Sequence, residues 1–275
     1  MNDCIESLQN PGIKEIVRLR RRTHRDEEGV LIVEGYREVL RALDNRVRLT
    51  KLYYCPELYV QGKHEPGLVE RARAAGAQVF RCAPRVFEKI AYRDRPEGLL
   101  ALSPQGRHRL EDLHLPEKPL LLVAEHIEKP GNLGTMLRSA DAAGVDALIV
   151  CDRCTDIHNP NVVRASIGTL FTVPLAEAST EETLKFLRAK GIRTLAATPH
   201  ATREYTEADM TQGVAIVVGA EQYGLSEAWM TRADEPVRIP MLGQADSLNV
   251  AAAATILLYE AVRQRRAAAK AAGGA

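Results

Sequence analysis

Three polar clusters interrupt the otherwise apolar C-terminal half of this 275-residue sequence. Residues 128–139 read EKPGNLGTMLRS, residues 217–226 read VVGAEQYGLS, and residues 239–250 read IPMLGQADSLNV. Each cluster combines glycine with side chains that donate or accept hydrogen bonds. Such groups can hold a polar ligand and can stabilise charge that develops on it.

Each cluster has a chemical interpretation and a plainer structural one. Arg138 lies in a helix whose N-terminus would suit an anion, or it is a surface arginine behind a turn. Gly219 would let a ligand approach the backbone near Glu221, or Glu221 is a solvated loop charge. Ser247 has an explanation as a helix N-cap. Asn249 is harder to explain in this way, because asparagine is a poor helix former.

The elements around the clusters alternate between strands and helices. Because the strands are apolar throughout, we expect a parallel sheet covered on both faces. Ligands bind such sheets at the carboxyl ends of the strands, and each cluster follows a strand. The expected strands span 120–124, 147–151, 194–197 and 214–218, and the expected helices span 133–143, 181–190, 225–232 and 248–271.

The N-terminal part predicts a second, smaller α/β unit. We therefore divide the chain into an N-terminal domain (1–104), a polar linker (105–118) and a C-terminal domain (119–275). The expected N-terminal strands span 30–33, 49–54, 78–81 and 99–102, and the expected helices span 11–25, 36–43, 66–75 and 84–91.

Charge is distributed unevenly, although the net charge is only +1. Residues 1–110 contain 21 Lys and Arg against 15 Asp and Glu, a balance of +6, and the remaining residues balance to −5. A basic run suits nucleic-acid phosphates, giving affinity without sequence reading; alternatively it is a solvated helix face. The run consists of Arg18, Arg20, Arg21, Arg22 and Arg25.

Several classes of function are disfavoured. No apolar run is long enough to span a membrane, and we expect a cytoplasmic protein with reduced thiols, since the five cysteines are few and odd in number. Cys151 and Cys154 form a C-x-x-C pair, but a zinc site would need a second pair, so we expect no metal. There is no G-x-G-x-x-G stretch of a dinucleotide-binding fold.

Taken together, the clusters resemble the SpoU/TrmH family of RNA 2′-O-ribose methyltransferases, within the SPOUT superfamily. The resemblance covers nearly all of residues 119–263, and a further stretch, NPNVVRASIGTLFTVP (159–174), is also similar to the family. The N-terminal stretches SLQNPGIKEIVRLRRR and LIVEGYREVLRAL resemble the family's substrate-binding domain, which is similar to ribosomal proteins that bind kinked RNA.

The resemblance implies a C-terminal trefoil knot, a homodimer and the cofactor S-adenosylmethionine. Simple topology alone would argue against a knot. Carried onto this sequence, the family's catalytic positions are Arg138, Asn132, Glu221, Ser247 and Asn249. Its cofactor contacts are Gly219, Ile239, Met241, Gly243 and Leu248.

The implied reaction is methyl transfer to a ribose 2′-hydroxyl, with large-subunit ribosomal RNA as the expected substrate. Transfer RNA is the nearest alternative, and a non-catalytic RNA-binding or ribosome-assembly factor is the alternative from another class. Arginine stays protonated in proteins. We therefore expect Arg138 to hold the adjacent phosphate and stabilise alkoxide charge, with Glu221, Ser247 and Asn249 orienting the ribose.

Overall fold

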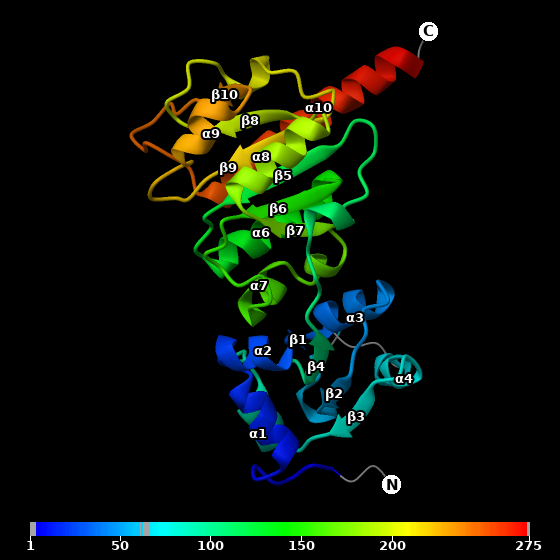
Figure 1. The fold of residues 1–275 in the computed structure, drawn as a ribbon. Coiled ribbons are helices and arrows are strands. Elements are labelled where there is room, and N and C mark those ends of the chain that lie inside the picture. The colour runs from blue at the N-terminus through cyan, green and yellow to red at the C-terminus, as the bar shows by residue number, and fades with distance from the viewer. Residues whose placement is uncertain (1–3, 61, 63–66, 274–275) are drawn as a thin grey trace. The chain divides into compact units, whose positions relative to one another are not determined.

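The computed structural model describes residues 4–60, 62 and 67–273. Contacts divide the chain into two compact units, residues 1–107 with 156–172 and residues 108–155 with 173–275 (Figure 1). Residues 156–172, which we expected inside the C-terminal domain, thus pack with the first unit. Part of the expected linker (105–118) belongs to the second unit, because Leu110, Leu113 and Leu115 pack against the core of that unit.

The first unit is built on a four-stranded mixed sheet in the order β1-β4-β2-β3, in which β2 and β3 pair in parallel and β4 pairs antiparallel with both β1 and β2. The strands are β1 (Val30–Glu34), β2 (Lys51–Tyr54), β3 (Gln78–Arg81) and β4 (Leu99–Pro104). The helices are α1 (Pro11–Arg18), α2 (Arg22–Glu28), α3 (Tyr36–Asp44), α4 (Leu68–Ala74), α5 (Pro84–Ile90) and α7 (Pro160–Ala165). The small α/β unit expected from the sequence is confirmed, although Pro66, its expected α4 start, lies outside the described residues.

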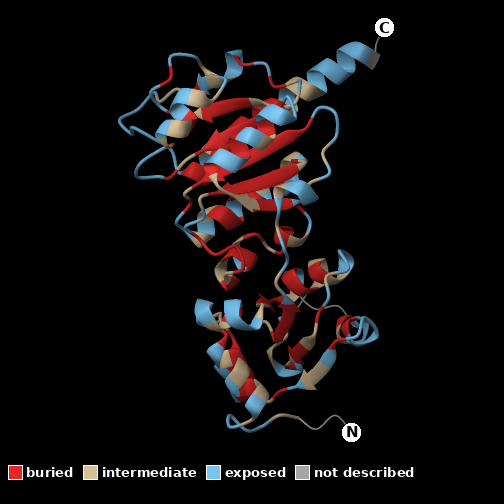
Figure 2. Cartoon of the chain, viewed as in Figure 1, coloured by how far each residue is buried: buried red, intermediate tan, exposed pale blue. Residues whose placement is uncertain are grey.

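Helices α1 and α5 pack together on one face of this sheet. Ile13 and Ile16 of α1 and Phe87 of α5 are buried there with Ile32 and Leu102 of the sheet. Burying such side chains stabilises each by roughly 1.5–3 kcal/mol. Figure 2 shows buried and exposed residues on different sides of α1. The exposed residues of the two helices include Lys14, Arg18, Arg85 and Lys89.

The single helix expected over residues 11–25 is wrong, because the structure has two helices separated by a turn. The turn frees the carbonyls of Leu19 and Arg20, and Arg25 Nη1 donates to both at 3.0 Å. Arg25 Nη2 donates to Asp156 Oδ2 at 2.7 Å, with both side chains at most 4% exposed. A guanidinium supplies enough donors to satisfy all three acceptors, so Arg25 stabilises the break.

The second unit contains a six-stranded sheet whose described pairings are all parallel, as expected, in the order β10-β8-β9-β5-β6-β7. The strands are β5 (Leu120–Glu125), β6 (Ala147–Cys151), β7 (Leu175–Ala178), β8 (Arg193–Ala197), β9 (Val214–Val218) and β10 (Glu235–Val237). The helices are α6 (Pro130–Ala143), α8 (Thr180–Ala189), α9 (Glu227–Arg232) and α10 (Val250–Gly273).

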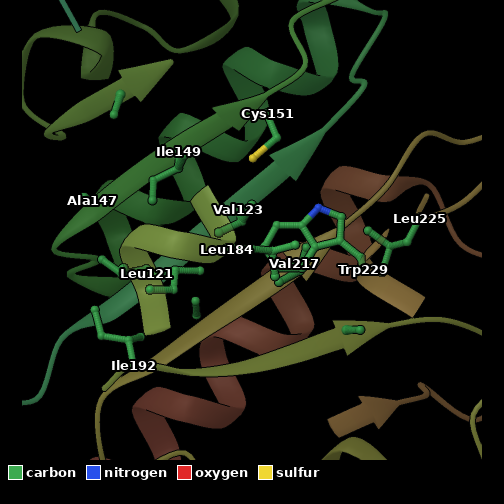
Figure 3. Close-up of a cluster of buried hydrophobic side chains, with 14 residues drawn as sticks. Leu121, Val123, Ala147, Ile149, Cys151, Leu184, Ile192, Val217, Leu225 and Trp229 are labelled. Atoms are coloured by element: carbon green, nitrogen blue, oxygen red, sulfur yellow. The ribbon is translucent and has the colours of Figure 1, made fainter. Parts of the chain in front are cut away.

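Helices α6 and α10 pack together on one face of this sheet, and α8 and α9 pack on the other side. The core beneath α8 and α9 is built around the fully buried Trp229, whose ring lies among Leu184, Val217 and Leu225 (Figure 3). A parallel sheet with both faces covered places its ligand site at the carboxyl ends of its strands. Within the described residues, no helix is long and apolar enough to cross a membrane.

Candidate active site

Glu221, which follows β9, is the centre of a polar cluster. Its Oε1 accepts hydrogen bonds from Asn132 Nδ2 at 2.8 Å and from Asn249 Nδ2 at 2.6 Å. Asn249 Nδ2 also lies 3.2 Å from Asn132 Oδ1. The three residues come from the first turn of α6, the loop after β9 and the start of α10, so the fold brings one residue of each sequence cluster together.

Lys129 belongs to this cluster, although sequence reasoning missed it. Its Nζ lies 2.5 Å from Glu221 Oε2. This hydrogen bond is the main reason that the pKa of Glu221 lies below its usual range and that the pKa of Lys129 is raised. Glu221 is therefore a carboxylate at neutral pH. The sequence offered one indication that Lys129 lies at the site, since it immediately precedes Pro130, the first residue of α6.

Asn249 also caps a helix, a structural role that was harder to assign to it from the sequence. Helix α10 begins at Val250, two residues later than expected, and Asn249 Oδ1 accepts the backbone N–H groups of Ala251 (3.1 Å) and Ala252 (3.3 Å). Asn249 is thus the N-cap, and Ser247 lies outside the helix. One amide caps α10 with its oxygen and reaches Glu221 with its nitrogen, so the cap fixes the orientation of the site.

A cavity of about 590 Å³ opens beside Glu221 at the carboxyl ends of β8 and β9. Gly219, Ile239, Met241, Ser247 and Leu248 line it, and Gly243 is not among its lining residues. A side chain at Gly219 would collide with the backbone of Gly224 and Leu225, because the loop folds back tightly there. Glycine at position 219 is therefore required by the turn itself.

Other lining residues were missed from the sequence. Thr198 and His200 follow β8 directly, where the rule about strand ends could have found them. Met230 comes from α9, and nothing in its sequence context separates it from a core residue. The apolar lining and exposed backbone are typical of a site for a largely apolar ring system with a few polar groups.

A second, smaller cavity of about 260 Å³ lies next to the first. Its lining includes Lys129 and Asn132, and it shares Glu221, Gln222 and Val250 with the larger cavity. Two ligand-sized spaces thus meet at the polar cluster. Such an arrangement can bring two reactants together.

Glu125, at the end of the central strand β5, supports the loop of residues 219–226 from below. It is fully buried, accepts a hydrogen bond from Thr180 Oγ1 at 2.8 Å and accepts the backbone N–H of Ser226 at 2.7 Å. A buried carboxylate needs such partners to offset desolvation. Glu125 therefore fixes the end of the loop that carries Glu221.

Arg138 lies away from this cluster. It is exposed on α6, six residues beyond Asn132, which is about 120° around the helix. Within the described part of the chain, no hydrogen bond or ion pair engages Arg138 or the hydroxyl of Ser247. The Arg138 guanidinium is free to bind an anion.

The expected basic run is divided by the structure. Arg18 and Arg21 are exposed, but Arg20 donates to backbone carbonyls and Arg22 pairs with Asp26 at 3.3 Å. Arg25 is buried in its pair with Asp156, so it does not offer a surface for a partner. No group of three or more candidate metal ligands was found among the described residues.

Two family models match separate parts of this chain. The model of the SpoU rRNA Methylase family matches residues 119–259, and that of the MRM3-like substrate binding domain matches residues 10–101. The first match contains both cavities and the polar cluster.

Similar proteins extend over nearly the whole chain. The 23S rRNA (guanosine(2553)-2′-O)-methyltransferase RlmP of Bacillus subtilis is 28% identical over 93% of this chain and 97% of that protein. The 23S rRNA (uridine(2479)-2′-O)-methyltransferase of Streptomyces viridochromogenes is 32% identical over 90% of this chain and 87% of that protein. The AdoMet-bound rRNA methyltransferase structure from Sinorhizobium meliloti is 33% identical, with a TM-score of 0.86 over 95% of this chain and 97% of that one. The chain belongs to the SpoU rRNA methylase family.

Proposed function

We propose that this protein transfers a methyl group from S-adenosylmethionine to a ribose 2′-hydroxyl of large-subunit ribosomal RNA. The observation that carries the proposal is the meeting of two cavities at Glu221, Asn132 and Asn249. The larger cavity would take the cofactor and the smaller one the target nucleotide. The named relatives act on 23S rRNA, which supports this substrate over transfer RNA.

The larger cavity fits the cofactor. Its volume of about 590 Å³ lies within the range of small-molecule sites. Gly219 brings the backbone close to the space, and Ile239, Met241 and Leu248 provide an apolar surface for an adenine ring. Structures of relatives with AdoMet bound support the same cofactor here.

Bound S-adenosylmethionine would supply an activated methyl group, so the protein must align it with the ribose oxygen, and the hydroxyl proton would pass to solvent water as the methyl group is transferred. Glu221, held as a carboxylate by Lys129, would accept a hydrogen bond from a ribose hydroxyl in the smaller cavity. Asn132 and Asn249 fix that carboxylate. Ser247 would contact the ligand at the edge of the larger cavity. Arg138 would hold a phosphate and stabilise developing alkoxide charge.

We further propose that the chain forms the family's trefoil knot. The return of the chain from the edge strand β10 to α10, which packs on α6 and beside the central strands, supports it. Residues 219–225 line the larger cavity together with Ile239, Met241 and residues 246–248, as two crossing segments of a knot would. We also propose that the first unit binds RNA in the manner of kinked-RNA-binding ribosomal proteins, which its match to a substrate-binding domain supports.

A homodimer completes the proposal. Leu242 and Tyr259 are large exposed side chains of the second unit that do not line the larger cavity, and Leu242 is 98% exposed. Exposed apolar side chains of this kind mark interaction surfaces when they gather. Light scattering after gel filtration should give twice the mass of 30.3 kDa. An rRNA substrate would make the protein cytoplasmic.

The test is methyl transfer from labelled S-adenosylmethionine to separated RNA fractions. Label should enter large-subunit rRNA with the wild type and be lost with Arg138→Ala. Label in transfer RNA instead would show that transfer RNA, not ribosomal RNA, is the substrate. Absence of both label and cofactor binding would reject the enzyme and favour a non-catalytic RNA-binding factor.

A further inference from the structure

The arginines and lysines of the first unit fall into two groups. Many are neutralised within the chain by exposed carboxylates, as in the pairs Arg71–Asp44, Arg81–Glu57 and Lys51–Glu15. A cation that is already paired loses much of its capacity to attract a polyanion. The cations that lack such a partner therefore identify the surface that can bind one.

Two helices carry regularly spaced cations of the second group. Lys14 and Arg18 lie four residues apart on α1, and Arg85 and Lys89 lie four residues apart on α5. All four are exposed, and none of their side chains has a hydrogen bond or ion pair within the described residues. Side chains four residues apart lie on the same side of a helix, so each helix presents a pair of free cations.

The two pairs belong to one surface. Helices α1 and α5 pack against each other over the buried residues Ile13, Ile16, Val86, Phe87 and Ile90. Arg20, just after α1, joins the C-terminal ends, because its Nη2 donates to the carbonyls of Lys89 (3.0 Å) and Ala91 (2.7 Å). The two rows of cations are therefore fixed on a rigid two-helix face.

Acidic residues on this face are few. Glu15 of α1 is engaged by Lys51 at 2.8 Å, which leaves Glu88 of α5 as the exposed carboxylate between Arg85 and Lys89. Within the described residues of this unit, the other exposed arginines whose side chains have no partner are Arg21, which follows α1, and Arg37, Arg46, Arg48, Arg95, Arg107 and Arg164, which lie in separate segments.

We infer that the α1–α5 face, defined by Lys14, Arg18, Arg85 and Lys89, binds the phosphate backbone of the substrate RNA. This inference rests on the proposed function and changes its RNA surface. Of the expected basic run, Arg22 and Arg25 are excluded from this RNA surface, because Arg22 is paired and Arg25 is buried. Lys14, Arg85 and Lys89 are added to the surface, although Arg85 and Lys89 are distant from the run in the sequence.

The test compares three double variants of the full chain: Lys14→Gln/Arg18→Gln, Arg85→Gln/Lys89→Gln, and the control Arg46→Gln/Arg48→Gln. The control removes the same charge from exposed, unpaired arginines of the same unit. The readout is the slope of log Kd against log salt concentration for a fluorescein-labelled RNA hairpin of random sequence. Each lost phosphate contact lowers this slope by about 0.7 to 0.9.

The α1 and α5 variants should each reduce the slope by about 1.5, and the control should leave it unchanged. Affinity for S-adenosylmethionine and the unfolding temperature, measured in parallel, show that the variants fold. An unchanged slope for the α5 variant, or an equal reduction in the control, would overturn the inference. If the wild type shows no methyl transfer, the proposed function is rejected. The RNA-binding inference is judged apart from that result, because RNA binding is measured separately.

Discussion

At the scale of single residues, the charge of Glu221 decides what the site can do. A carboxylate whose pKa lies below its usual range is a weak base, so Glu221 is unsuited to removing the proton of a ribose hydroxyl. It is well suited to accept a hydrogen bond from that ribose and to fix two amides. Lys129 is the first cause of this state, and its removal is therefore informative.

Lys129→Gln should move the acid side of the pH–activity profile upward. Glu221 is held ionised by its partners, so its contribution is present above its ordinary pKa and is lost as the pH falls through the depressed value. Without the ammonium, this loss begins at a higher pH. Lys129→Arg keeps the charge and should keep the profile. Superimposable acid limbs for Gln and wild type would show that Lys129 does not control Glu221.

Arg138→Lys tests whether the guanidinium itself is needed. If Arg138 binds a phosphate through its planar pair of donors, a lysine keeps the charge but loses the two-point contact. We expect a fall in kcat of about tenfold or more, corresponding to at least one hydrogen bond to a charged group. Single-turnover kinetics with rRNA would measure it. Near-normal activity would rule out a role that needs two-point binding.

At the scale of elements, the sequence predicted what hydrophobic patterning controls. The limits of β3, β6 and β9 agree with expectation to the residue, and for β6 and β9 the reason is an unbroken apolar run bounded by aspartates or by glycines. Short β7, β10 and α7 were missed, because three to six residues carry too little periodicity. The break between α1 and α2 depends on Asp156, more than 130 residues away, which no local pattern reveals.

The residues of the candidate site likewise fall into those that sequence patterns could identify and those that only the fold reveals. Residues around glycine turns and strand ends, such as Asn132 and Glu221, could be selected from the sequence. The capping role of Asn249 required the start of α10, which is known to about two residues from patterning alone. Lys129 and Glu125 act through partners that are distant in the sequence, so only the fold reveals them.

The buried pair of Arg25 and Asp156 should be important for the stability of the first unit. Asp156→Asn leaves the guanidinium buried without its counter-charge, and breaking such a pair costs about 3–5 kcal/mol. Denaturant unfolding would measure this. The exposed pair of Arg22 and Asp26 is the matched control, since Asp26→Asn should cost at most about 1 kcal/mol. Equal effects of the two variants would contradict a special role for the buried pair.

At the scale of the whole molecule, the separation of Arg138 from Glu221 needs an explanation. Both belong to the proposed site, yet Arg138 lies about 120° around α6 from Asn132, the α6 residue that contacts Glu221, and no hydrogen bond or ion pair joins Arg138 to Glu221 within the described residues. Either the substrate RNA bridges them within one protomer, or a second protomer brings its own Arg138 to the cavities. The exposed apolar residues of the second unit favour the second arrangement.

Mixing two inactive variants distinguishes these arrangements. Arg138→Ala and Glu221→Gln are each expected to be inactive as pure proteins. If the site is shared between protomers, a mixed dimer contains one intact site, so random re-association at equal amounts should restore about a quarter of wild-type activity. If each site is built within one chain, every site stays defective and the mixture stays inactive. Unfolding and refolding the variants together, with each refolded alone as the control, makes the comparison independent of subunit exchange rates.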